Sequence, residues 1–411
     1  PLPSTAATGS TAGSTATTPS ADTVAEATTP ATTPTTTPAT TAPVPPTGKP
    51  IVFAADGETI IGGTDLSMSM LGMEAWAKQV NSRGGLFGRP VEIRRCDFKL
   101  DPQAATACVQ DAIADPDVLA FAGAASSLQP VVAGPAAEAA GMLILPGSAV
   151  SPTAGSMPTG FVPMTGTGVL LQGVPKYLVE KVGLTKVASI RADLEATAPN
   201  AALVKTTVEA AGGQFVADVK VPLTATDMAP AVAEAAAAGA QVIVASLAIG
   251  GTIGVVNAIR DGGFAGKIAI VTGPTNVGDA GLEAAVKDAG VDWYFGSETD
   301  AFLEGGATHA DYVAAMTLNG SADKIPSAHC WLSYQAGLAM EAIIKAAGPD
   351  LTRKSLLDAA MSGTFDVKGY LEPLHRGIVA ATPAYATNKM NVFKFPSEKL
   401  NAQPVDVYPT T

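Results

Sequence analysis

The sequence is poor in cysteine, in histidine and in positive charge. Its 411 residues include three cysteines and three histidines, and 25 Lys and Arg residues stand against 37 Asp and Glu residues, for a net charge of −12 at pH 7. Nucleic acids and anionic membrane surfaces bind proteins through an excess of Lys and Arg, so we expect neither as a partner. No apolar run approaches the roughly 20 residues that span a bilayer, so we expect no transmembrane helix.

The few cysteines favour a disulfide over a metal site. Cys96 ends a predicted strand, and Cys108 lies in the predicted helix that follows it. A strand end and the next helix pack together in an α/β unit, so we expect a Cys96–Cys108 disulfide in an exported protein. Zinc is less favoured, because His309, His329 and His375 are far apart and no Cys-x-x-Cys or His-x-x-x-His pair occurs. We predict no metal and no cofactor.

Sequence motifs of common enzymes are also missing. The Gly266-Lys267 pair is followed by Ile268 rather than by Ser or Thr, so it does not form a phosphate-binding loop. Ser148 lacks the flanking glycines of a nucleophile elbow. The histidines have no obvious acidic or nucleophilic neighbour in the sequence, and we expect surface or core roles for them. We therefore expect no catalytic activity.

The first 50 residues form a low-complexity tract of Thr, Ala, Pro and Ser. Its only charged residues are Asp22, Glu26 and Lys49, and it has no aromatic residue. Such a segment cannot bury a core, so residues 1–50 are predicted to be a disordered, extended linker. Thr/Pro-rich composition is typical of O-glycosylated stalks on exported proteins, and we favour a tether to the cell envelope over a dispensable tail.

From residue 51 onward, short apolar runs alternate with amphipathic segments. Two successive series of this kind predict an α/β fold with two doubly wound, Rossmann-like lobes. The predicted strands are 51–55, 91–96, 118–123, 142–146, 186–190, 215–221, 241–247, 267–272 and 293–298, with two more at 366–370 and 390–395. The predicted helices are 65–83, 102–114, 128–140, 170–182, 197–211, 228–238, 252–262, 280–289, 308–319, 328–347 and 352–361. We expect the last three helices to return to the first lobe, whose sheet otherwise lacks helices on one face.

The segment 118–152 is a β-α-β unit whose strands end in two loops of small and hydroxyl residues. The first loop contains Ser126 and Ser127, and the second contains Gly147, Ser148 and Ala149. In an open α/β sheet the ligand crevice lies outside the carboxyl ends of the strands, so both loops are predicted to line it. One of the two adjacent serines would also cap the next helix, whose positive end favours an anionic group. The alternative is that both serines are plain N-caps and turn residues.

These motifs together resemble those of a known family. The run from Asn81 to Val91, NSRGGLFGRPV, resembles the N-x-x-G-G-I/L-x-G-x-x-V signature of the leucine/isoleucine/valine-binding-protein-like receptors, which are type I periplasmic binding proteins serving ABC importers. The segment from Cys96 to Cys108, the two loops described above and the segment beginning at Tyr177 are similar as well. The resemblance extends from residue 51 to the C-terminus in the same order of elements.

The resemblance implies two lobes joined by a hinge of three crossing strands, which close on a small molecule. The crossings are expected near 165–168, 299–301 and 375–386. Lobe 1 would comprise residues 51–166 and 301–380, and lobe 2 residues 167–300 and 386–411. The implied function is that of an extracytoplasmic solute-binding protein that delivers its ligand to an ABC permease, either anchored to the cell surface as a lipoprotein or secreted. The alternative is an extracellular ligand-sensing module that signals through a partner protein.

The resemblance also implies which residues bind the ligand. In this family, backbone N–H groups and a hydroxyl of the two first-lobe loops hold a ligand carboxylate, which corresponds here to Ser126 or Ser127 and to residues 147–149. The second lobe would contribute the residues at the matching positions of its own loops, which are Glu195, Thr197, Ala248, Thr275 and Asn276.

The chain departs from the pattern of the amino-acid binders in the family. Those proteins place a tyrosine and an acidic residue in the second lobe, whereas this chain has Glu195-Ala196-Thr197 and Pro274-Thr275-Asn276 there. A buried ammonium without a counter-charge costs roughly several kcal/mol. Either another acid reaches the site, or the ligand has no α-ammonium group; the candidate acids are Glu58, Glu195, Glu298 and Asp300. We favour the second reading, with a small carboxylate, an amide or a similar polar or amphipathic metabolite as ligand.

Overall fold

A computed structural model gives the structure of the chain, which divides into two units, Pro1–Ala42 and Pro43–Thr411. The described helices and strands all lie in the second unit. The residues described are 45–57, 60–61, 64–65, 67–99, 101–123, 125–126, 128–149, 151–164, 169–193, 197–222, 224–299, 302, 305–380, 382–395 and 403–406. Most of the predicted stalk and the predicted crossing at 165–168 lie outside them.

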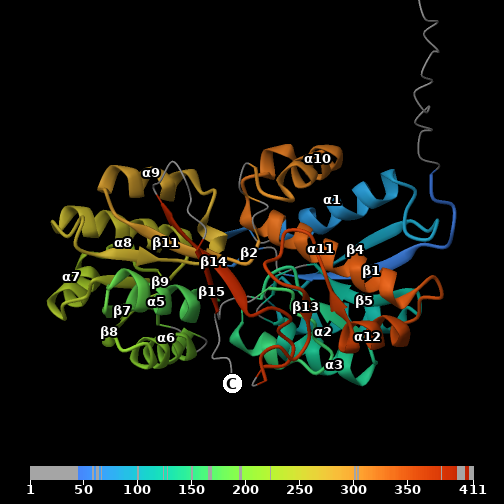
Figure 1. Ribbon diagram of the computed structural model, residues 1–411, viewed down its shortest axis with the longest axis horizontal. Coiled ribbons are helices and arrows are strands. Elements are labelled where there is room, and N and C mark those ends of the chain that lie inside the picture. The colour runs from blue at the N-terminus through green and yellow to red at the C-terminus, as the bar shows by residue number, and fades with distance from the viewer. Residues whose placement is uncertain are drawn as a thin grey trace, which may run out of the picture. The chain divides into compact units, whose positions relative to one another are not determined.

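The first lobe is built on a parallel sheet with the strand order β4-β1-β5-β6. Its strands are β1 (Ile51–Gly57), β4 (Val91–Asp97), β5 (Val118–Ala122) and β6 (Leu143–Leu145). Every residue of β1 and β5 is buried, as their continuous apolar sequences predict for the inner strands of a parallel sheet. One face is covered by α1 (Met68–Ser82), and the other by α2 (Pro102–Ala114) and α3 (Gly134–Ala139) (Figure 1). The turn η1 (Gln129–Ala133) directly precedes α3. A short hairpin, β2 (Ile60–Ile61) and β3 (Thr64–Asp65), follows β1.

The second lobe has a seven-stranded sheet with the order β15-β14-β11-β10-β9-β7-β8. The strands are β7 (Lys186–Ala192), β8 (Gln214–Val221), β9 (Val242–Ser246), β10 (Ala269–Val271), β11 (Trp293–Ser297), β14 (Lys389–Phe395) and β15 (Gln403–Asp406). The first five are parallel, and β14 pairs antiparallel with β11. The helices are η3 (Val169–Gly173), α5 (Val174–Tyr177), η4 (Leu178–Val182), α6 (Ala198–Ala210), α7 (Ala229–Ala237), α8 (Ile249–Asp261) and α9 (Ala280–Ala289). In Figure 1, α8 and α9 cover one face of this sheet, and α5 and α6 cover the other.

The last helices return to the first lobe, as the sequence predicts. Both α10 (His309–Asn319) and α11 (Ala328–Ala347) pack against α1, and α12 (Arg353–Ser362) packs against β5 and β6. The approach of α1 to α11 is close because glycines lie at the contact. A Cβ on Gly72 would stand 2.0 Å from the Cys330 carbonyl oxygen, and one on Gly337 would stand 2.4 Å from the Trp76 ring. The lobe boundaries themselves stay a prediction.

The predicted strand at 366–370 is wrong. Only β12 (Thr364–Phe365) is a strand here; it pairs with β13 (Leu374–His375), and turns follow it. Gly369 has φ +92°, which a regular strand does not contain, and a Cβ there would stand 2.3 Å from the Gln335 amide nitrogen. The segment therefore bends around the buried side of α11 instead of continuing the strand.

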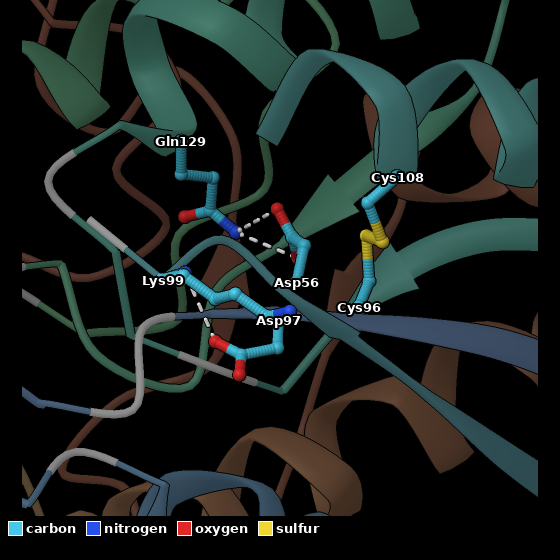
Figure 2. Close-up of a disulfide and its surroundings, with 6 residues drawn as sticks. All are labelled: Asp56, Cys96, Asp97, Lys99, Cys108 and Gln129. Carbon is cyan, nitrogen blue, oxygen red and sulfur yellow. Dashed lines mark hydrogen bonds between the residues drawn. A yellow bond between two sulfur atoms is a disulfide. The ribbon is translucent and has the colours of Figure 1, made fainter. Parts of the chain in front are cut away.

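Cys96 at the end of β4 and Cys108 in α2 form the predicted disulfide, with an S–S distance of 2.00 Å and a Cα–Cα distance of 5.7 Å (Figure 2). The bridge spans 12 residues of sequence. Replacing both cysteines with serine should lower the free energy of unfolding by about 2–3 kcal/mol, because the crosslink restricts the unfolded chain. Urea denaturation of the double variant beside the wild type measures this. An unchanged urea midpoint would show that the bridge does not stabilise the fold.

Candidate ligand-binding site

The two loops that the sequence singles out lie side by side at the carboxyl edge of the first sheet. The Gly123 N–H donates to the Leu145 carbonyl oxygen at 2.9 Å, and Ala125 forms a parallel bridge with Ser148. The loops touch through their backbones at Gly147, where a Cβ would stand 2.4 Å from the Gly123 oxygen. The pair therefore presents main-chain groups of both loops in one place.

The two serines that the structure describes in these loops have different roles. The Ser126 hydroxyl accepts a hydrogen bond from the Leu128 N–H at 3.0 Å, so it holds the start of the next helical turn. Ser148 is 5 % exposed, and its hydroxyl makes no hydrogen bond within the part of the chain that the structure describes. The Ser148 hydroxyl is therefore the one available to a ligand. Ser127 lies outside the described residues.

Helices α1 and α11 both form hydrogen bonds with the backbone of the first loop. The Ser69 hydroxyl of α1 accepts a hydrogen bond from the Ala125 N–H at 3.2 Å. The Ser333 hydroxyl of α11 donates to the Gly123 carbonyl oxygen. Both serines are fully buried. The loop is thus held by two helices that come from opposite ends of the folded sequence.

A buried carboxyl group lies beneath the same loop. Asp56, near the end of β1, is 0 % exposed, and Gln129 at the start of η1 is 1 % exposed. The Gln129 amide nitrogen stands 3.0 Å from each Asp56 carboxylate oxygen, and its own oxygen points away from Asp56 (Figure 2). Burial raises the pKa of Asp56 from 3.8 to about 7, although the hydrogen bonds from Gln129 and from its own backbone act in the opposite direction. Sequence reasoning missed both residues.

Thr197, predicted to contact the ligand, has a structural role in the second lobe. Its hydroxyl donates to the Ala192 carbonyl oxygen at 2.6 Å and accepts from the Arg191 guanidinium at 3.2 Å. Arg191 also forms two hydrogen bonds of 2.9 Å with Asp218, and this pairing raises the pKa of Arg191. The buried cation at the end of β7 is therefore already neutralised by Asp218.

The other predicted residues of the second lobe also lie where its parallel strands end. Ala248 precedes α8 as its N-cap and carries no polar side chain. Thr275 and Asn276 belong to η6 (Pro274–Asn276), a short 3-10 turn after β10 that contacts α11. Glu195 lies outside the described residues.

Of the acids considered as partners for a ligand ammonium, Glu298 is the one that the structure describes. It follows β11 and is 3 % exposed. Burial raises the pKa of Tyr370 well above its ordinary value, and the negative charge of Glu298 adds to this effect. Glu58, Glu195 and Asp300 lie outside the described residues. Glu298 thus directly precedes the predicted crossing at 299–301, where Thr299 bridges to Tyr370.

Among the residues that the structure describes, no group of three or more His, Cys, Asp and Glu residues is arranged to hold a metal ion. None of the helices there is long and apolar enough to cross a membrane.

Comparisons with known proteins agree with this architecture. A protein from Rhodospirillum rubrum, assigned provisionally to branched-chain amino acid ABC transport, is 21 % identical; the match covers 87 % of this chain and 100 % of that one, with a TM-score of 0.64. A solute-binding protein of an R. palustris ABC transporter, in complex with benzoate, is 18 % identical, with coverages of 87 % and 96 % and a TM-score of 0.68. A fatty acid ABC transporter substrate-binding protein from Thermomonospora curvata is 20 % identical, with coverages of 89 % and 94 % and a TM-score of 0.68. No curated protein matches the chain.

A comparison of the sequence with the profiles of protein families gives the same result. The profile described as periplasmic binding protein matches residues 61–398, which include both sheets except for the first strand and the last. The two parallel-sheet lobes and the order of their elements are those of the type I members. The chain therefore belongs to the periplasmic binding protein family.

Proposed function

We propose that the chain is the extracytoplasmic solute-binding protein of an ABC importer and captures a small carboxylate or amide-like metabolite. The observation that carries the proposal is the available Ser148 hydroxyl beside the paired backbones of the two first-lobe loops. A hydroxyl and backbone amides bind a carboxylate or an amide without a fixed counter-charge, and exclusion of water strengthens each such hydrogen bond. The second lobe would complete the site with residues of its own loops, including Thr275 and Asn276.

The charges near the predicted site support a ligand without an α-ammonium group. Asp56 has no solvent-exposed surface, and its carboxylate oxygens both face Gln129. Arg191 is paired with Asp218. Relatives of similar structure bind benzoate or are described as fatty acid carriers, and both kinds of ligand are carboxylates without an ammonium group. An aromatic or aliphatic carboxylic acid, or its amide, is the ligand class that we infer.

The proposal includes a partner and a location. The permease of the importer would dock transiently on the loaded protein, and the Thr/Pro-rich residues at the N-terminal end would tether the folded unit to the cell envelope, through a lipid anchor if the protein is a lipoprotein. The alternative location is outside the cell, as a secreted protein without an anchor. Reconstitution with a permease in proteoliposomes distinguishes a transport receptor from a sensory module, because only the former stimulates ligand uptake.

A matched pair of ligands tests the ligand class. 4-Methylpentanoate is leucine without its amino group, so isothermal titration with both compounds isolates the effect of the ammonium. We expect binding heat with 4-methylpentanoate, benzoate or benzamide, and none with leucine. A ligand at a hundredfold its Kd stabilises the folded state by about 2.7 kcal/mol, so a thermal-shift screen finds it first. Tight leucine binding, or no binding by any carboxylate or amide of a broad panel, would contradict the proposal.

Replacing Ser148 with alanine should weaken the best ligand of that panel about tenfold, because one hydrogen bond in a closed site is lost. The fold should be unaffected, since the Ser148 hydroxyl has no partner among the described residues. Ser362→Ala is the matched control: that exposed hydroxyl donates to the Asp358 carbonyl oxygen in α12, remote from the loops. Equal affinities of the Ser148→Ala variant and the wild type would remove Ser148 from the site.

A further inference from the structure

Asp56 and Gln129 are both buried, and Gln129 lies directly after the first-lobe loop that follows β5. We propose that they are positioning residues, which hold the loop after β5 in its binding geometry only while Asp56 is ionised. The inference rests on the proposed function, because that loop carries Ser126 and is paired with Ser148. The pair is called the Asp56–Gln129 brace below.

The brace connects two elements that are distant in sequence. Asp56 lies on β1, an inner strand of the first sheet, and Gln129 is the first residue of η1, directly after the loop. The Gln129 amide nitrogen stands 3.0 Å from both carboxylate oxygens (Figure 2). The hydrogen bond of Ser126 with Leu128 is local to the loop, whereas the brace fixes the far end of the loop to the sheet.

Protonation of Asp56 changes this contact. An ionised carboxylate only accepts hydrogen bonds, which suits the NH₂ group of Gln129. A protonated carboxyl presents an O–H donor to that NH₂ group, so part of the contact is lost unless the Gln129 amide turns over. In the amide orientation that the structure shows, protonation of Asp56 therefore weakens the contact that ties Gln129 to the sheet.

The elements packed around Asp56 provide no ion pair for it within the described residues. On β4, the neighbours are Cys96, which is held in the disulfide, and Asp97, whose carboxylate accepts from the Lys99 N–H at 3.0 Å. Cys108 on α2 is the other half of that disulfide. Strand β5 and helix η1 have no ionisable side chain, and the acid of α1, Glu74, is paired with Arg95. Burial raises the pKa of Asp56 to about 7. Asp56 therefore changes its charge in a pH range in which the protein can be measured on both sides of the transition.

Hydrogen–deuterium exchange on the ligand-free full chain tests the brace. The readout is the protection factor of peptides covering residues 118–133 at pH 8 and at pH 5.5, corrected for the intrinsic rate of exchange. In the wild type we expect about tenfold lower protection at pH 5.5, because the loop loses a hydrogen bond to a charged group. Peptides covering 242–258 in the second lobe should show no loss of protection at pH 5.5. No ligand is used, so failure of the proposed function and failure of the brace are distinguishable.

Three variants separate a positioning role from a structural one. Asp56→Asn can still present a carbonyl oxygen to Gln129, so protection should be high at both pH values. Asp56→Leu and Gln129→Met cannot form this hydrogen bond, so each should lower protection about tenfold at pH 8. Gln129→Met provides the test if Asp56→Leu does not fold. Asp97→Asn, the neighbouring carboxyl on β4, should behave as the wild type. Equal wild-type protection at pH 8 and pH 5.5, or an unchanged pH dependence in Asp56→Asn, would overturn the proposal.

Discussion

Replacing Gly147 with alanine should weaken ligand binding by at least about tenfold and lower the free energy of unfolding by about 1–3 kcal/mol. The added Cβ would stand 2.4 Å from the Gly123 oxygen and 2.6 Å from the Gly123 carbonyl carbon. Both are backbone atoms at the end of β5, so no side chain can move aside and the two loops must separate. Separation disturbs the Ala125–Ser148 bridge, which sets the geometry of the site.

Gly250→Ala is the matched control for this variant. Gly250 lies in α8, and a Cβ there meets no atom within 4 Å. It should leave the stability equal to or slightly above that of the wild type, because alanine favours the helix. Urea denaturation measures the stability of both variants, and isothermal titration with the best ligand of the panel measures the affinity of Gly147→Ala. A Gly147→Ala protein with wild-type affinity would show that the contact between the two loops has no part in binding.

Replacing Asp56 with asparagine should stabilise the protein at pH 8 and have little effect at pH 4. The folded-state pKa of Asp56 is about 7, above its ordinary value of 3.8. Between these values the folded protein binds a proton that the unfolded chain has released, so the contribution of Asp56 to stability falls as the pH rises from about 4 to about 7. The full shift corresponds to about 4 kcal/mol. Asparagine carries no charge to bury, so the variant does not lose stability as the pH rises from about 4 to about 7.

Urea denaturation of the wild type and of Asp56→Asn at a series of pH values measures the effect. The difference between their free energies of unfolding should grow from pH 4 to pH 7 and then level off. Asp97→Asn is the control on the neighbouring strand. A difference independent of pH would mean that Asp56 does not titrate in this range. Global stability should thus fall with rising pH while protection of the loop after β5 rises, a combination that a purely structural role for Asp56 does not produce.

Much of the fold follows from local sequence patterns. Continuous apolar runs bounded by Gly, Ser or Pro predicted β1 and β5, whose residues are buried on both faces of the sheet. Alternation with helices predicted two doubly wound lobes, and a sheet face left without helices predicted that the last three helices return to the first lobe. The strand predicted at 366–370 failed, because a pattern of alternating residues does not reveal that Gly369 must bend around Gln335.

The site was less accessible to sequence reasoning. The loops 123–127 and 147–149 could be placed, since the carboxyl ends of parallel strands meet at one edge. The difference between Ser126 and Ser148 could not, because it depends on which hydroxyl finds a backbone partner in the folded chain. The Asp56–Gln129 contact joins residues 73 positions apart, and its sole signal in the sequence is an acid at the end of an apolar strand.

The return of α11 to α1 has a consequence for biosynthesis. The parallel strands of the second lobe, β7 to β11, occupy residues 186–297 without interruption, so all five are made in a single stretch of nascent chain, and β14 and β15 join their sheet later. The first lobe begins at residue 51 but receives α11 only at residue 328, after the five parallel strands of the second lobe have been synthesised. Until then, the surface of α1 around Gly72 and Trp76 is without its partner helix. A polypeptide arrested on the ribosome before this point exposes an apolar surface, and chaperones that hold unfinished chains would be needed there.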